Sequence, residues 1–108
     1  MNNFCNVWLS CADGAEADKI AKVLLEKRLV ACVKKLPINS TFHWKGNVEN
    51  SDEILLLMDS KQDLFEEIEA EVTKLHSYET FVLQSTPITN VSQKAEVWLI
   101  GSLQLYTK

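Results

Sequence analysis

The chain has 108 residues, of which 46% are hydrophobic and 24% charged, the ordinary balance of a globular protein, and we expect a single domain over residues 1–108. Its net charge of -4 comes without a basic patch, so nucleic acid is not an expected partner. No apolar run approaches the roughly 20 residues that span a bilayer, and the N-terminal residues lack the features of a signal peptide, so no membrane association is expected.

The first elements are indicated by an apolar strand and a capping motif. The apolar residues 4–10 lie between polar turn formers and predict a buried strand. Asp13 and Glu16 form the capping-box pattern of a helix, in which the aspartate accepts from an amide and the glutamate reaches back. Apolar residues then recur at helical spacing to about Arg28. The valine- and cysteine-containing stretch 29–36 predicts a second strand.

A long hairpin is expected next. Pro37 interrupts the second strand, which indicates either a bulge or a position at the edge of a sheet. The strand resumes over residues 41–44, and residues 45–50 are expected to reverse the chain. The apolar run 53–58 then predicts the returning strand.

A second capping pattern, Ser60 to Asp63, precedes the clearest amphipathic helix. Its apolar residues, spaced three or four apart, are Leu64, Phe65, Ile68, Val72 and Leu75. Residues 81–88 predict the last strand. Asn90 with Gln93 is expected to cap a closing helix that ends near Gly101.

The order strand, helix, strand, strand, helix, strand is that of an α+β ferredoxin-like βαββαβ sandwich, here with an extra C-terminal helix. Right-handed crossovers place both main helices on one face of an antiparallel sheet. The apolar run Ile54–Met58 does not alternate with polar residues, so we expect it to be buried on both sides. A chain this short cannot cover both faces of its sheet, and other copies of the chain are expected to do so.

Few side chains carry a chemical signal of their own. The three cysteines lack CxxC spacing, which favours neither a disulfide framework nor a zinc knuckle and fits a reducing cytoplasm. His76 and Glu79 lie three residues apart at a predicted helix end, a spacing that can direct both at one ion; a histidine capping its own helix is the alternative. No catalytic triad, nucleophile elbow or P-loop occurs, so no enzyme is expected.

Scattered identities in a fixed order run from Val7 to Leu103, nearly the whole chain. They are Ala31-Cys32-Val33, Pro37, Ser40, Trp44, Gly46, Glu53, Leu56, His76, Tyr78, Pro87 and Trp98. In these the chain resembles the CutA family of divalent-cation-tolerance proteins. The resemblance implies a homotrimer, similar in assembly to the PII signal proteins and held by the long second and third strands. It also implies a role in tolerance of, or response to, divalent metal ions such as copper.

The resemblance also suggests where an ion binds. In family members described as copper-binding, the ligands include a cysteine late in the first strand and a histidine pair before the tyrosine. Here Leu9 and Leu75 stand at two of these positions, so only His76 remains. Cys11 follows Leu9 on the same strand face, and we expect weak binding of copper or another divalent cation through His76, Cys11 and Glu79.

Two alternatives remain open from the sequence. One is a PII-like signalling trimer that binds a small ligand in the cleft between subunits, around His76, Tyr78, Trp44 and Lys45. The other is a structural trimer whose site has decayed. The departures from the family pattern that favour decay are Asp59, Ser77, Phe81 and Val82.

Overall fold

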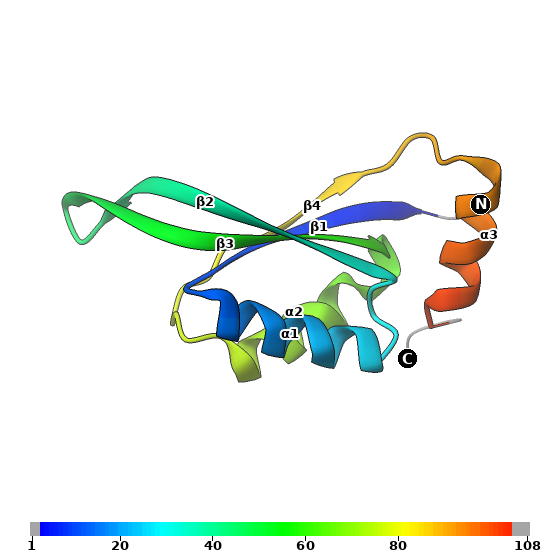
Figure 1. Cartoon of the computed structure of the whole chain (residues 1–108), viewed down its shortest axis with the longest axis horizontal. Coiled ribbons are helices and arrows are strands. Elements are labelled where there is room, and N and C mark those ends of the chain that lie inside the picture. The colour runs from blue at the N-terminus through cyan, green and yellow to red at the C-terminus, as the bar shows by residue number, and fades with distance from the viewer. Residues whose placement is uncertain (1–2, 105–108) are drawn as a thin grey trace.

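The computed structural model describes residues 3–104 (Figure 1). The elements, in chain order, are β1 (Phe4–Cys11), α1 (Gly14–Glu26), β2 (Cys32–Trp44), β3 (Asn47–Lys61), the 3-10 turn η1 (Gln62–Leu64), α2 (Phe65–Leu75), β4 (Leu83–Pro87) and α3 (Gln93–Ser102). This confirms the predicted βαββαβ order with an additional C-terminal helix. No helix within residues 3–104 is both long and apolar enough to cross a membrane.

The four strands form one antiparallel sheet in the order β2-β3-β1-β4. The helices α1 and α2 lie side by side beneath one face of this sheet, while α3 stands at the end opposite the β2–β3 turn (Figure 1). Both βαβ halves therefore return their helices to the same face, as a right-handed crossover requires.

The core lies between this face and the two helices. On β1 every second side chain is buried, and these side chains meet apolar residues of α1 and α2. The core residues with no exposed surface on β1 and the two helices are Cys5, Val7, Leu9, Cys11, Ala17, Ile20, Leu24, Ile68 and Val72. Cys11 is the last residue of β1, and its side chain points into this core.

Both ends of α1 are closed by local hydrogen bonds. At the start, Asp13 Oδ1 accepts from the backbone N–H of Glu16 at 2.9 Å, and Glu16 Oε1 accepts from that of Ala12 at 2.8 Å. At the end, Arg28 takes a left-handed backbone conformation with φ of 58°, and Leu29 N donates to Leu24 O. Because this turn takes up the next residues, β2 begins at Cys32 and not at residue 29 as predicted.

Replacing Asp13 with alanine is expected to lower the free energy of unfolding by about 0.5–2 kcal/mol, because the Glu16 amide loses its acceptor. Ser92 is the matched control. It is the N-cap of α3 but makes no side-chain cap hydrogen bond, so Ser92→Ala should change stability by less than about 0.5 kcal/mol. Urea denaturation compares the two variants, and equal losses would contradict the capping role of Asp13.

The strands β2 and β3 form a long hairpin, called here the arm. They pair residue for residue from Cys32 opposite Asp59 to Trp44 opposite Asn47. The predicted bulge at Pro37 is wrong, since Pro37 pairs regularly with Ile54, but the alternative of an edge position is correct because β2 is an outer strand.

The arm turns over only two residues. Lys45 and Gly46 have φ of 50° and 83°, the positive values of the turn type that matches the twist of a two-residue hairpin. Residues 47–50, which were predicted as part of the reversal, therefore belong to β3.

Three further predictions of local structure need correction. Ser60 does not cap α2, because it lies in β3, where its buried hydroxyl donates to Leu29 O at 2.6 Å. The last strand is shorter than residues 81–88, and Phe81 instead stacks on the ring of His76. Ser92, and not Asn90, is the N-cap of α3.

The C-terminal end of α3 is attached to the end of α1. The Arg28 guanidinium donates to Gly101 O, Gln104 N donates to Arg28 O at 2.9 Å, and the Gln104 side chain donates to Lys27 O at 2.7 Å. Within the described residues, these contacts explain why α3 stays at the end of the sheet.

The two faces of the arm differ in character. The apolar arm face is defined here by the apolar residues of β2 that point away from α1, which are Leu36, Ile38, Phe42 and Trp44. Leu36 and Trp44 are 41% and 45% exposed. The opposite face carries a ladder of polar side chains in which Asn39, Thr41, Asn50 and Asp52 are hydrogen-bonded.

The apolar run of β3 is only partly buried within one chain. Leu56 and Met58 are fully buried against the helices, whereas Leu55 and Leu57 are half-buried on the other face. The single subunit thus leaves one side of the predicted doubly buried strand open.

Candidate metal centre

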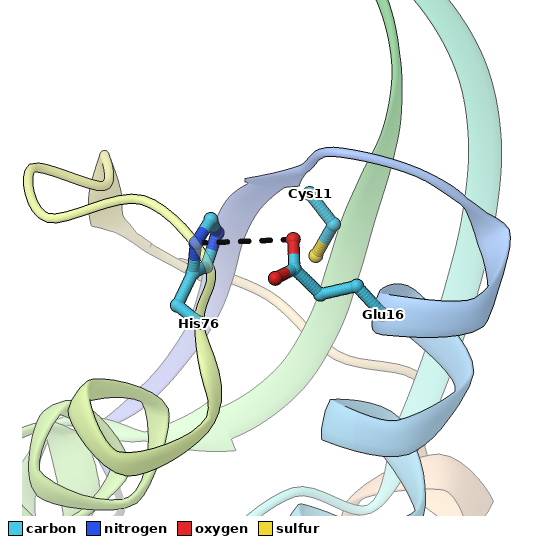
Figure 2. Close-up of side chains that lie close together, drawn as sticks. All are labelled: Cys11, Glu16 and His76. Atoms are coloured by element: carbon cyan, nitrogen blue, oxygen red, sulfur yellow. Dashed lines mark ion pairs between the residues drawn. The ribbon is translucent and has the colours of Figure 1, made fainter.

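Three side chains that commonly bind metals lie together where β1, α1 and α2 end or begin. The sulfur of Cys11, a carboxylate oxygen of Glu16 and a ring nitrogen of His76 all lie within 4.8 Å of one another. Figure 2 shows the three side chains pointing toward one another from three separate segments. Thiol, imidazole and carboxylate are a donor set that suits zinc and copper, so the residues present fit a divalent cation.

Local structure brings each of the three to this point. Cys11 lies at the inward-facing end of β1. Glu16 turns back toward β1 because its carboxylate caps the Ala12 amide. His76 ends α2, where its N–H bonds to Val72 O at 2.9 Å and its backbone becomes extended.

The imidazole of His76 is held on both sides. Nε2 donates to the carbonyl of Ser10 at 2.8 Å, and Nδ1 accepts from the backbone N–H of Tyr78 at 3.0 Å. Because a carbonyl only accepts and an N–H only donates, the proton of the neutral ring is on Nε2. The side chain has no exposed surface, and Glu16 Oε1 lies 3.8 Å from Nδ1.

Glu16 is a carboxylate with several donors around it. Partial burial by itself raises its pKa, but hydrogen bonds from Ala12 and Ser77 and the neighbouring His76 outweigh this and hold the pKa below its ordinary value. The contact with the Ser77 amide is short, at 2.5 Å. Glu16 is therefore ionised and supplies the negative charge that a cation needs.

Cys11 is the opposite case. Burial first, and then the charges of Glu16, Glu53 and Asp13, raise the pKa of its thiol to about 12. The sulfur is a thiol in the free protein, so a metal ion that binds it has to displace a proton.

The polar network extends to β3 through Tyr78. Its hydroxyl donates to Glu53 Oε2 at 2.7 Å, and Glu53 is only 7% exposed. Burial, followed by this hydrogen bond and the charge of Glu53, raises the pKa of Tyr78 to about 12. Tyr78 is thus a neutral donor that connects the segment after α2 to the base of the arm.

The structure brings some of the sequence-predicted residues together and separates others. Cys11 and His76 are in the cluster, whereas Glu79 is exposed and is not part of it. Trp44 and Lys45 lie at the tip of the arm, where the Lys45 ammonium is 5.6 Å from the Trp44 ring centroid. Tyr78 lies at the base of the arm, so one chain alone does not join it to these two.

Sequence reasoning missed Glu16 as a possible ligand. The capping box carried the signal, because a glutamate that reaches back over the start of a helix also reaches the end of the preceding strand. Nothing in the local sequence around Glu53 indicated its contact with Tyr78.

Comparison with known proteins gives consistent matches. A family model described as CutA1 divalent ion tolerance protein matches residues 5–102. A divalent-cation tolerance protein CutA from Archaeoglobus fulgidus is 35% identical over 99 residues, which are 92% of this chain and 95% of that protein. A protein CutA homolog from Danio rerio is 33% identical over 92 residues, covering 84% of this chain but only 61% of the relative.

The fold has equally close counterparts. The solved structure of the periplasmic divalent cation tolerance protein CutA from Archaeoglobus fulgidus superposes with a TM-score of 0.91 at 32% identity. The match covers 94% of this chain and 99% of that one.

Proposed function

The chain belongs to the family of CutA1 divalent ion tolerance proteins, and from this premise we propose that it binds a divalent cation weakly through Cys11, Glu16 and His76. The observation that supports this is the convergence of the three ligand types within 4.8 Å. A bound cation would neutralise the charge of Glu16 and take the place of the thiol proton. Zinc and copper are the ions that this donor set favours.

Weak binding is expected because the ligand atoms already have partners. Nδ1 of His76 and the oxygens of Glu16 accept backbone hydrogen bonds, and Cys11 is protonated. A cation has to displace some of these before it coordinates, which lowers its net affinity.

Calorimetric titration with zinc tests the site. Loss of a residue that hydrogen-bonds to a metal ligand lowers metal affinity by roughly 10–100-fold. His76→Ala removes a ligand itself, so it is expected to weaken zinc binding by more than this. His43→Ala is the matched control, since His43 is the other of the two histidines and is exposed on the arm. Cys11→Ala and Cys5→Ala form a second pair, in which both thiols are buried but only Cys11 is in the cluster.

A third pair distinguishes the two candidate carboxylates. Glu16→Gln should weaken zinc binding, and Glu79→Ala should leave it unchanged. Tight binding that survives His76→Ala would show that the ion sits elsewhere in the protein.

We also propose that the chain assembles as a homotrimer in which the apolar arm face is covered by another copy. The exposure of Leu36, Phe42 and Trp44 on one face of an otherwise polar arm supports this. The outer edge of β2 supports it too, because within the described residues no strand pairs with that edge.

A second candidate function is suggested by the two ends of the arm. Trp44 and Lys45 at the tip and Tyr78 at the base would meet only across two copies, which is the arrangement a PII-like trimer needs to bind a small ligand. A metabolite screen by thermal shift tests this, with Lys45→Ala as the variant expected to abolish any stabilisation. A trimer that responds to neither metal nor metabolite would support a purely structural role.

We further propose a cytoplasmic location and a non-enzymatic role. The three cysteines are all unpaired, which suits a reducing compartment. Cell fractionation tests the location, because the Archaeoglobus fulgidus relative is described as periplasmic.

A further inference from the structure

The backbone that follows His76 is held by the same atoms that would bind the cation. Tyr78 N–H donates to Nδ1 of His76 at 3.0 Å, and Ser77 N–H donates to Oε2 of Glu16 at 2.5 Å. Ser77 and Tyr78 are called here the docked segment. Two of the three candidate ligands therefore also hold the docked segment in place.

The His76 imidazole cannot bind a cation and accept the Tyr78 hydrogen bond at the same time. A neutral ring has one lone pair, and with the proton on Nε2 that lone pair is on Nδ1. Nδ1 is also the nitrogen that faces Glu16 across the cluster, as the dashed line in Figure 2 marks. Coordination through Nδ1 thus takes the only lone pair that the Tyr78 amide can use.

Coordination through the other ring nitrogen, Nε2, would also break a hydrogen bond. Nε2 donates to Ser10 O at 2.8 Å within the fully buried ring, so its use requires a shift of the ring proton and the loss of that bond. Glu16 is less restricted, because each carboxylate oxygen has two lone pairs and can keep an amide while it binds an ion.

We infer that a divalent cation and the Tyr78 amide compete for Nδ1 of His76, so that occupation of the site releases the Tyr78 amide while Glu16 keeps that of Ser77. The inference rests on the proposed metal site and adds that binding of an ion there changes the backbone that follows His76. By thermodynamic linkage, an ion that displaces the Tyr78 amide binds more weakly by the free energy of the hydrogen bond it breaks.

Release of the Tyr78 amide can affect the arm through one hydrogen bond. The Tyr78 hydroxyl is bonded at 2.7 Å to Glu53, which lies in β3 at the base of the arm and pairs with Ile38 on the apolar arm face. Movement of the Tyr78 backbone therefore acts on a residue next to the surface that we propose other copies cover.

Amide hydrogen exchange, resolved by NMR, tests the competition in the full chain with and without zinc, which is diamagnetic and does not oxidise thiols. Saturating zinc is expected to accelerate exchange at Tyr78 by about tenfold, the factor that corresponds to the loss of one hydrogen bond. Amides in the middle of α1, at Ile20 and Leu24, should not change.

Two variants and a control give the same test without relying on the addition of zinc alone. His76→Ala removes the acceptor, so Tyr78 should exchange fast in the absence of zinc and show no further response. Glu16→Gln should weaken zinc binding and leave the Tyr78 amide protected in the metal-free protein. His43→Ala should behave as the wild type in both states.

The outcomes separate the inference from the proposed function. Zinc binding that depends on His76 but leaves or slows exchange at Tyr78 would overturn the competition and keep the metal site. The absence of zinc binding in calorimetry would overturn both. Faster exchange at Tyr78 upon zinc binding, together with fast exchange in metal-free His76→Ala, would support both.

Discussion

Replacing Leu36 with glutamate is expected to convert the proposed homotrimer into a folded monomer. Leu36 is 41% exposed in the single chain, so the carboxylate stays hydrated there and the subunit keeps its fold. In the proposed trimer the same carboxylate would be buried without a partner on the apolar arm face, which is costly enough to prevent assembly. Light scattering during size exclusion should give a mass near the 12.3 kDa of one chain, against about three times that value for the wild type.

The control for Leu36→Glu is His43→Glu, which adds the same charge to the opposite, polar face of the same strand. It is expected to leave the trimer intact. Circular dichroism should show native secondary structure in both variants. A trimeric Leu36→Glu protein would mean that the apolar arm face is not the interface, and a monomeric wild type would remove the assembly altogether.

Replacing Trp44 with alanine is expected to destabilise the assembled protein by about 3–5 kcal/mol. In the single chain this side chain is 45% exposed and contacts the Lys45 ammonium, so nearly half of its surface is available to a second copy. Tryptophan is among the residue types whose truncation most often costs a large share of the binding free energy of an interface. Thermal unfolding at fixed protein concentration measures the loss.

Val48→Ala is the matched truncation for Trp44→Ala. Val48 pairs with His43 near the tip, lies on the polar face and is 65% exposed, so its loss should change stability by less than about 0.5 kcal/mol. An unchanged melting temperature for Trp44→Ala would show that the arm does not pack against another copy through its tip.

The fold could be predicted from the sequence because its periodic signals are local. The helical spacing of Leu64 to Leu75, the Asp13 capping box and the apolar strands each identified an element and its place in the order. The predicted ends of helices and strands were wrong where a residue adopted a conformation or a contact that is unusual for its type. Arg28 adopts a left-handed conformation that sequence rules assign to glycine, and Ser60 uses its hydroxyl inside the core instead of at a helix end.

The candidate site could be predicted only in part, because it is assembled from three distant segments. His76 and Cys11 were identified from the resemblance and from strand periodicity. Glu79 was chosen because it is near His76 in sequence, as though the helix continued. The backbone at His76 is extended, with φ of -78° and ψ of 139°, and this carries Glu79 outward. Glu16, which lies far earlier in the chain than His76, occupies the position beside the imidazole.

The open outer edge of β2 has a consequence for how the protein is made. A newly synthesised subunit presents a strand of 13 residues with which no other strand of residues 3–104 pairs on the outer side, next to an apolar surface. Such an edge templates pairing with any extended chain, so correct assembly competes kinetically with aggregation. Aggregation through open edges joins many chains and therefore rises more steeply with concentration than the association of two or three subunits. The yield of native protein in refolding should therefore pass through a maximum as the protein concentration rises. In dilute solution the subunits rarely meet and their edges stay uncovered. In concentrated solution unfolded chains pair with the edges before native subunits do.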